Sequence, residues 1–395
     1  MASTDAAAGA VGGYVAPGFE GVRAAFAENL RERGELGAAF AVTHEGVLVV
    51  DLWGGVADPE TGRPWRQDTL QLIFSGTKGL VALCLAMLVD RGRLELDAPV
   101  ARYWPEFAAA GKQDLRVLDV ASHQAALPGI ATPLAPDDVL DDRRMAALLA
   151  AQPPDPDPRA AATYHPLTYG WLCGELVRRV DGRSVGRFFA EEVAAPLDLE
   201  VWIGLPAHLE PRVSRLAQSP HWGRRAGWDD PGTFERDPLL GRIWNNPPLF
   251  APGPIAWNDP AWHRAEIPGA GAIATARSMA RLYGALALGG TLDGVRLLDS
   301  ATLERAHRPV SRRFDPIAQA EQVFGVGFEL QAPARALGPA DDAFGHCGAG
   351  GSVHAAWPSL RAGVSYAMNE MRDDELADPR ARALLDATHA ALVGR

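Results

Sequence analysis

The residues in this sequence whose types and spacing most clearly suggest catalysis are Ser75 and Lys78, a serine and a lysine three residues apart. They open a long apolar stretch that ends at Gly92 and is expected to be a buried helix. Residues three apart share one face of a helix, so the amine should lie beside the hydroxyl. Apolar surroundings lower the pKa of a lysine, which lets it take the serine proton and create a nucleophile. The alternative is a serine that only caps the helix, with an unrelated surface lysine.

Two downstream segments carry groups that a nucleophilic serine needs. Tyr164 precedes a predicted helix over 167–180 and could share a proton with Lys78, since a nearby ammonium favours the phenolate. Residues 344–352 read Phe-Gly-His-Cys-Gly-Ala-Gly-Gly-Ser, and their glycines let backbone amides approach an oxyanion. Each segment also has an ordinary explanation, namely a half-buried packing tyrosine and a glycine-rich turn without a ligand.

Together, in this order and at these separations, the three segments resemble the serine β-lactamase and penicillin-binding-protein superfamily. The resemblance is greatest to its class C-like branch, which includes the family VIII carboxylesterases. It implies that Ser75 is acylated, that Lys78 accepts its proton, and that Tyr164 acts as general base and acid. The sequence departs from the family's Tyr-x-Asn motif at Pro166, which stands where the asparagine should be.

The segment that matches the family's Lys-Thr-Gly motif begins at His346. By position, the resemblance implies an oxyanion hole formed by the backbone N–H groups of Ser75 and Ala349, and substrate contacts at His346, Gly348 and Gly350. A histidine near its reference pKa is mostly neutral at pH 7, so it replaces the lysine poorly as a partner for a substrate carboxylate. This change and the missing asparagine weaken the case for β-lactam hydrolysis and favour an esterase.

We therefore expect a serine hydrolase of the carboxylesterase type (EC 3.1.1), acting on a small-molecule ester through an acyl-enzyme without metal or organic cofactor. The same site would also serve an acyltransferase, a D-aminopeptidase or amidase, or a weak β-lactamase, because these differ only in the bond cleaved or in the acyl acceptor. A catalytically silent binding protein is less favoured, because Ser75, Lys78 and Tyr164 are all retained. The sequence leaves the oligomeric state open.

Several other reactive residue types have structural explanations. Residues 182–186, Gly-Arg-Ser-Val-Gly, fit the nucleophile elbow of α/β-hydrolases, but that elbow follows a strand and here a helix is expected. Ser184 is instead predicted to cap the next helix. His123 and His165 are expected to be structural, and Cys347 to be an ordinary strand residue. The histidines form no recognisable ligand pattern, so no metal site is expected.

Six tryptophans gather within residues 201–262, namely Trp202, Trp222, Trp228, Trp244, Trp257 and Trp262. They could form an aromatic wall of an acyl or alcohol pocket over Ser75. For any single one of them, packing in the core of this region is the favoured interpretation.

The elements that must position these residues lie near both ends of the chain. Amphipathic or apolar patterns predict helices over 18–34, 75–91 and 379–393, a hairpin from 38–42 and 47–53, and strands over 325–330, 345–357 and 363–369. Helical patches over 141–151, 167–180 and 185–195 lie between, separated by many prolines.

This distribution predicts an α/β (α+β) fold of the β-lactamase-like type. Its antiparallel sheet is flanked by helices and built from both termini, and a mostly helical region is inserted. We expect the α/β domain to comprise residues 1–90 and 268–395, and the inserted domain, with its Trp- and Pro-rich loops, to comprise residues 91–267.

Length and composition limit the remaining possibilities. The chain has 395 residues, 47% hydrophobic and 22% charged, with a net charge of −11, which fits a globular protein and disfavours nucleic acid or an anionic membrane as partner. The longest apolar run, 80–89, is too short to span a membrane, and 1–13 does not resemble a signal peptide. Three scattered cysteines do not suggest a disulfide framework. We therefore expect a cytoplasmic protein.

Overall fold

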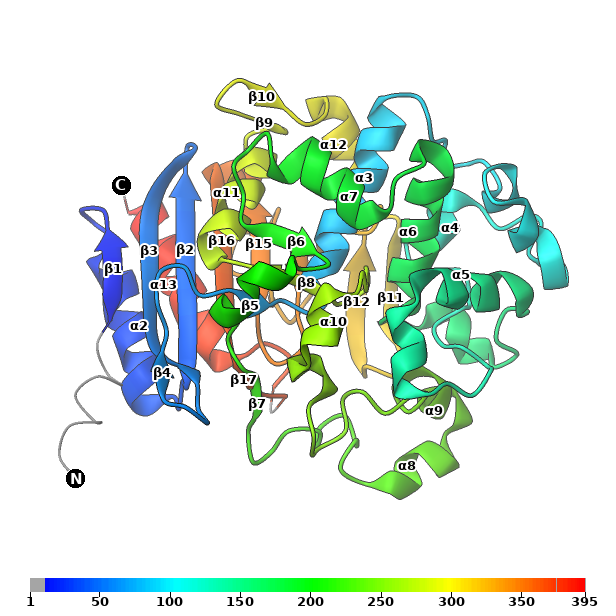
Figure 1. The fold of residues 1–395 in the computed structure, drawn as a ribbon. Helices are drawn as coiled ribbons and strands as arrows, with labels where there is room; N and C mark the ends of the chain where they lie inside the picture. Colours follow the sequence, from blue (N-terminus) through cyan, green and yellow to red (C-terminus); the bar gives the residue numbers. More distant parts are fainter. Residues whose placement is uncertain (1–10, 374, 395) are drawn as a thin grey trace.

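The computed structural model describes residues 11–373 and 375–394. In this part of the chain an antiparallel sheet of ten strands forms the centre of the fold, in the order β1-β3-β2-β16-β15-β14-β13-β12-β11 with β4 paired to β3 (Figure 1). The strands are β1 (Gly12–Val15), β2 (Gly37–His44), β3 (Val47–Asp58), β4 (Arg63–Pro64), β11 (Ser311–Asp315), β12 (Ala320–Phe324), β13 (Glu329–Leu330), β14 (Phe344–Cys347), β15 (Val353–Trp357) and β16 (Ala362–Met368). N-terminal and C-terminal strands join where β2 pairs with β16. The predicted antiparallel sheet built from both termini is confirmed.

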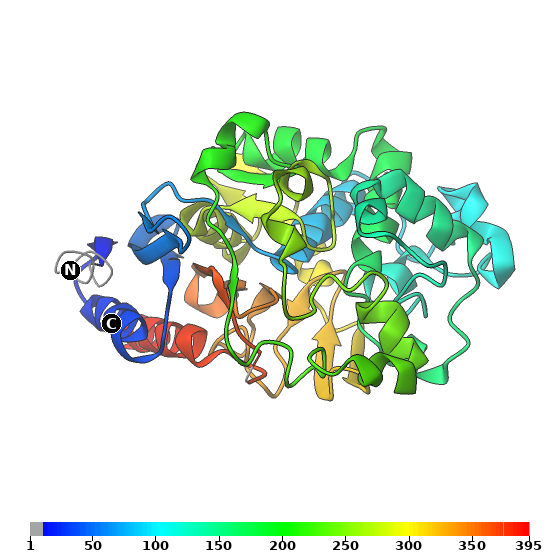
Figure 2. The ribbon, with the colours of Figure 1, turned by 60° about the horizontal axis from the view of Figure 1, so that its bottom comes forward.

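Helices cover both faces of this sheet. On one face α2 (Glu20–Glu32) and α13 (Pro379–Val393) lie side by side, and their apolar residues share one core cluster with residues of β2 and β16 (Figure 2). On the other face α11 (Ala276–Ala287) packs against β2, β15 and β16. The close approach of α11 requires Gly363, because a Cβ there would collide with the backbone of Gly284 and Ala280.

The central helix of the second face is α3 (Gly76–Asp90). Its residues from Gly76 to Leu88 are all buried, as expected for a helix that is apolar on every side. It contacts β14 of the large sheet as well as α6 (Thr168–Asp181) and α7 (Val185–Phe189). The residues at its N-terminus are therefore held between the sheet and the helical region.

Residues 91–267 contain mainly helices and loops, and α4, α5 and α6 lie at the end of the molecule opposite β1 (Figure 1). The elements besides α6 and α7 are α4 (Val117–Ala121), α5 (Asp142–Ala151), α8 (Pro231–Arg236), α9 (Pro238–Trp244), α10 (Pro260–Arg264), β6 (Val201–Ile203) and β7 (Ala217–Gln218). Strand β6 joins β5 (Gln71–Leu72) and β8 (Ala272–Ala274) in a small sheet, so strands on either side of the region fasten it. The boundaries near 90 and 268 stay predictions.

The remaining elements follow β8 along the chain. They are β9 (Thr291–Leu292), β10 (Val295–Arg296), α12 (Ser300–Ala306) and β17 (Glu370–Met371). The predicted helices and the first hairpin all appear, with ends shifted by at most two residues except that β3 extends five residues beyond the predicted end, to Asp58. The helix predicted over 185–195 becomes α7 followed by a π-helical turn over Ala190–Ala194. No helix in residues 11–373 and 375–394 is long and apolar enough to cross a bilayer. The interpretation of 1–13 falls mostly on residues 1–10, which lie outside the described residues.

Two predicted strands differ from the structure. The strand expected over 345–357 is a hairpin, because Gly350 and Gly351 adopt φ angles of 87° and 118° and turn the chain between β14 and β15. The strand expected over 325–330 is limited to β13, since Gly327 has a φ of 81° and breaks the extended run. In both cases glycine with a positive φ ends the strand.

Candidate active site

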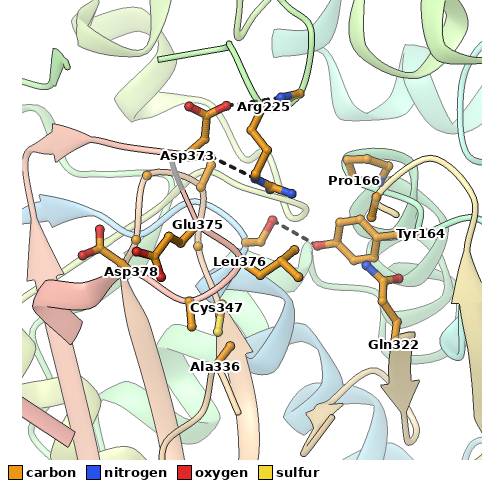
Figure 3. Close-up of a pocket in the computed structure, with 18 of the residues that line it drawn as sticks. Tyr164, Pro166, Arg225, Gln322, Ala336, Cys347, Asp373, Glu375, Leu376 and Asp378 are labelled. Carbon is orange, nitrogen blue, oxygen red and sulfur yellow. Dashed lines mark hydrogen bonds between the residues drawn. The ribbon is translucent and has the colours of Figure 1, made fainter. Parts of the chain in front are cut away.

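Ser75, Lys78 and Tyr164 meet at a pocket beside the N-terminus of α3. Lys78 Nζ lies 2.9 Å from Ser75 Oγ, and Tyr164 Oη lies 3.0 Å from the same oxygen. In Figure 3 the dashed line from Tyr164 marks this hydrogen bond. The structure thus brings an amine, a phenol and a hydroxyl to hydrogen-bonding distance although Tyr164 follows Ser75 by 89 residues.

The turn before α3 presents the Ser75 hydroxyl to the pocket. Phe74 has a φ of 45°, a left-handed conformation that is uncommon for a side chain of this size and redirects the chain from β5 into the helix. Its ring is fixed by Phe250 and Trp257, with centroids 5.7 and 5.3 Å away. The Ser75 side chain makes no capping hydrogen bond to α3. The capping alternative is therefore wrong, and the hydroxyl is left to Lys78 and Tyr164.

Lys78 is fully buried, and burial lowers the pKa of its amine well below the usual value, although the carboxylate of Glu329 opposes this shift. Nζ donates to the carbonyl oxygen of Gly269 at 2.6 Å. That bond fixes the amine 2.9 Å from Ser75 Oγ, where its unprotonated form can accept the serine proton. The Gly269 carbonyl was not identified from the sequence, because a backbone oxygen leaves no residue-type signal.

Tyr164 is held as a neutral phenol. Burial raises its pKa well above the usual value and outweighs the hydrogen bond to Ser75, which lowers it, so the expected shift toward the phenolate is wrong. Its backbone N–H donates to Asp315 at 2.7 Å, and its ring lies parallel to that of Phe324 with centroids 5.7 Å apart. The ring of His123 contacts both, with centroids 4.7 Å from Tyr164 and 4.4 Å from Phe324. A rigid phenol at this place is a proton donor.

His346 lies behind Tyr164 and is uncharged. Its Nδ1 is 2.7 Å from the carbonyl oxygen of Cys347, which only accepts hydrogen bonds, so the proton is on Nδ1. The bare Nε2 faces Tyr164 Oη at 3.5 Å. Burial, with a further contribution from Lys78, lowers the pKa of His346 to about 3. The expectation that this histidine is neutral, unlike the lysine of the family motif, agrees with its lowered pKa.

The turn between β14 and β15 offers free backbone donors beside Ser75. Within the described chain, the N–H groups of Ser75 and Ala349 donate to no protein acceptor, and both residues line the pocket. The turn is held by the carbonyl of Gly350, which accepts from Arg372 N at 3.1 Å and from Arg380 Nη2 at 3.2 Å. Two unused donors near a nucleophile suit a developing oxyanion.

The pocket has a volume of about 420 Å³ and is partly aromatic. Of the six tryptophans of 201–262, Trp222, Trp228 and Trp244 line it, while Trp257 and Trp262 are buried in the core. Some of these tryptophans therefore line the pocket, and others pack the core of the region. Gly348 and Gly350 also line the pocket, as does Pro166.

The other residues considered from the sequence have structural contacts. His165 accepts from Leu127 N and pairs with the Thr163 carbonyl, and Ser184 caps α7 by accepting from Arg187 N. His123 accepts from the backbone N–H of His165. Cys347 ends β14 as expected and borders the pocket, and burial raises its pKa well above the usual value.

Glu329 is a site residue that sequence reasoning missed. Its carboxylate accepts from Cys347 N at 2.8 Å and borders the pocket. A single glutamate in a short strand carries no motif, so only the fold reveals its place. In residues 11–373 and 375–394 no group of three histidine, cysteine or acidic side chains is placed to hold a metal ion.

The fold and the site together define an active-site-serine hydrolase with a β-lactamase-like fold. The family model described as Beta-lactamase matches residues 22–389, and the chain belongs to this family. It is 36% identical over 387 residues to the esterase/beta-lactamase LipL of Mycobacterium tuberculosis, across 97% of this chain and 86% of that protein.

Solved structures share both the fold and much of the sequence. A family VIII carboxylesterase is 39% identical with a TM-score of 0.87, covering 97% of this chain and all (100%) of that chain. A penicillin-binding protein homologue from Caulobacter crescentus is 40% identical with a TM-score of 0.86, with the same coverage of 97% and 100%. The expected family resemblance is thereby confirmed.

Proposed function

We propose that the protein is a carboxylesterase that hydrolyses small-molecule esters through an acyl-enzyme on Ser75. One observation carries the proposal: a single hydroxyl at a pocket lies 2.9 Å from a buried amine and 3.0 Å from a phenol. The names of similar proteins, an esterase/beta-lactamase and a family VIII carboxylesterase, support the ester as substrate.

Acylation follows from the protonation states of the three groups. Neutral Lys78 takes the Ser75 proton while Oγ attacks the ester carbonyl carbon. The free N–H groups of Ser75 and Ala349 stabilise the negative oxygen of the tetrahedral intermediate. When the C–O bond to the alcohol breaks, Tyr164 protonates the leaving oxygen, and the proton held by Lys78 then returns to Tyr164.

Deacylation uses the same groups on water. A water molecule takes the place vacated by the alcohol, next to Tyr164 Oη and Lys78 Nζ. Its proton passes to the amine as its oxygen attacks the acyl carbon, and the bond to Ser75 Oγ breaks. The serine oxygen regains a proton, the carboxylic acid leaves, and no cofactor takes part in the cycle.

Two features of the site rank ester cleavage above β-lactam hydrolysis. His346 is neutral with a pKa of about 3, so it offers no cation to a substrate carboxylate. Pro166 borders the pocket without the side-chain amide of the family's Tyr-x-Asn motif. Neither feature affects the attack of Ser75 on a simple ester.

A comparison of substrate classes tests this function. We expect kcat/KM for p-nitrophenyl butyrate to exceed the values for nitrocefin and for a D-aminoacyl amide by orders of magnitude, and Ser75→Ala to abolish all of them. Added short alcohols report acyl transfer through the yield of new ester. Nitrocefin turnover as fast as ester turnover would reverse the ranking, and unchanged ester turnover in Ser75→Ala would refute the acyl-enzyme.

Two broader features belong to the same proposal. We place the pocket between an α/β domain (1–90 with 268–395) and an inserted domain (91–267), since the former supplies Ser75 and Lys78 and the latter supplies Tyr164. We also assign the protein to the cytoplasm, supported by its free cysteines, as is usual in reducing compartments.

A further inference from the structure

Glu329 places a carboxylate at the pocket next to the reacting groups. It lies on β13, its side chain is 24% exposed, and it lines the same pocket as Ser75, Tyr164 and His346. Its Oε2 accepts from Cys347 N at 2.8 Å, which fixes the carboxylate at the end of β14. The proposed reaction gives this carboxylate no step.

Among the described side chains, Glu329 has no lysine or arginine within ion-pair distance. Burial raises the pKa of its carboxyl above the usual value, while the hydrogen bond from Cys347 N opposes this shift. Of the described side chains, only His346 approaches it as an ion-pair candidate, with Nδ1 at 3.5 Å. That nitrogen already donates to the Cys347 carbonyl, and the ring is neutral. Burial lowers the pKa of Lys78 well below its usual value, and the attraction between Lys78 and Glu329 opposes the shift of each group. Above its raised pKa, Glu329 presents an ionised carboxylate at the edge of the pocket, and a ligand of opposite charge stabilises that form.

The described lining of the pocket is acidic as a whole. Its carboxylates are Asp315, Glu329, Asp373, Glu375 and Asp378, and its cations are Arg225 and Arg372. Arg372 is paired with Glu370 at 2.6 Å, and Arg225 Nε donates to the backbone carbonyl of Asp373 at 2.9 Å (Figure 3). Two of these carboxylates are paired with arginines outside the lining, Asp378 with Arg380 at 2.7 Å and Glu375 with Arg382 at 3.7 Å. Glu329 is therefore the carboxylate closest to the reacting groups that has no such partner among the described side chains.

The proposed chemistry places the leaving alcohol near Glu329. Tyr164 must reach the leaving oxygen to protonate it, so the alcohol portion lies beside Tyr164 Oη. The ring of His346 separates that oxygen from the carboxylate: Nε2 is 3.5 Å from Tyr164 Oη and Nδ1 is 3.5 Å from Glu329 Oε2. A substituent on the alcohol a few bonds from the ester oxygen thus comes within the range of the charge.

We infer that Glu329 sets the substrate class, so that the enzyme prefers esters whose alcohol carries an ammonium group, accepts uncharged alcohols, and discriminates against alcohols that carry a carboxylate. This inference rests on the proposed function. A partly desolvated pocket weakens the screening that water gives to such charges, so one carboxylate is enough to rank substrates of equal shape.

Three acetate esters of similar size test the inference: acetylcholine, its uncharged isostere 3,3-dimethylbutyl acetate, and 4-acetoxybutanoate. We expect kcat/KM to fall in that order, with about a tenfold step between cationic and uncharged ester, the size of one partly screened charge interaction. In Glu329→Gln, which keeps an acceptor for Cys347 N, this step should disappear. The readout is the ratio of kcat/KM for acetylcholine to kcat/KM for 3,3-dimethylbutyl acetate. Glu329 also raises the pKa of Lys78, but this effect changes both values alike and cancels in the ratio.

A matched control is Glu375→Gln, which removes one charge from the wall of the pocket opposite Tyr164 (Figure 3). It should leave the ratio near its wild-type value. If the ratio in Glu329→Gln equals that of the wild type while the uncharged ester is still cleaved in a Ser75-dependent way, the inference is wrong and the esterase stands. If the uncharged ester is not cleaved through Ser75, the proposed function itself fails.

A measurement on the unaltered protein covers the case in which Glu329→Gln does not fold. Choline and 3,3-dimethylbutan-1-ol have the same shape and differ in charge. We expect choline to be the stronger competitive inhibitor of ester cleavage by the wild type. Equal inhibition constants for the two alcohols would overturn the inference.

Discussion

Removing only the hydroxyl of Tyr164 separates its chemical role from its packing. In Tyr164→Phe the ring keeps its contacts with Phe324 and His123, while Oη, 3.0 Å from Ser75 Oγ, is lost. General acid catalysis contributes about 10²- to 10⁴-fold in rate, so the loss is about 3 to 5 kcal/mol of transition-state stabilisation. The fold should be unaffected, because the only described side chains hydrogen-bonded to this oxygen are those of Ser75 and, at 3.5 Å, His346.

The loss should depend on the leaving group. p-Nitrophenolate is a stable anion and can leave without being protonated, whereas ethoxide must be protonated as it leaves. In Tyr164→Phe, kcat/KM for ethyl butyrate should therefore fall far more than kcat/KM for p-nitrophenyl butyrate. The assay compares both esters with wild type, Tyr164→Phe and a control, Tyr169→Phe. The control removes a buried hydroxyl that lies against Gly327 and not Ser75, so it should change neither value much. An equal loss for the two esters would refute the role of Tyr164 as donor to the alcohol.

Three further changes test other parts of the structure. Lys78→Met should abolish esterase activity. In urea unfolding the variant should be more stable than the wild type, because between the lowered pKa of Lys78 and 10.5 only the unfolded wild type binds the proton. The difference in the free energy of unfolding should be largest below the lowered pKa and should vanish as pH approaches 10.5. His354 is buried, and burial lowers its pKa to about 3 from 6.5. As pH falls through that range, the free energy of unfolding should therefore decrease by about 5 kcal/mol, at about 1.36 kcal/mol per pH unit. His354→Asn should reduce this slope in acid unfolding curves by its own share, because His165 and His346 have the same lowered pKa, and an unchanged slope would contradict the assignment. Arg380→Met leaves the buried carboxylates of Glu35 and Asp378 without their cation, so it should cost about 3 to 5 kcal/mol in thermal unfolding, and a loss below 1 kcal/mol would count against this network.

Local patterns predicted the parts of the site that depend on helix geometry. Ser75 and Lys78 share a face of α3 because three residues span nearly one helical turn, and the apolar run around them already indicated burial. Tyr164 and the glycine-rich segment were identified by their residue types, and the family resemblance then assigned them roles from their order along the chain. These residues therefore meet as the sequence suggested.

Contacts between distant segments could not be predicted in the same way. The Gly269 carbonyl meets Lys78 across 191 residues, and Arg380 meets Gly350 only after α13 has packed against the sheet. Glu329 reaches the pocket because β13 pairs with β14, a pairing that no local pattern encodes. The hairpin at 344–357 was missed as a strand pair although two adjacent glycines marked its turn, since the apolar residues on both sides favoured one continuous strand.

Trapping the acyl group tests the central claim most directly. The protein is mixed with excess p-nitrophenyl butyrate, quenched in acid within the first turnover, and measured as intact protein and as peptides by mass spectrometry. The account predicts one added butyryl group on the peptide that contains Ser75, and none in Ser75→Ala. A butyryl group on another residue, such as Cys347, or one that persists in Ser75→Ala, would contradict it.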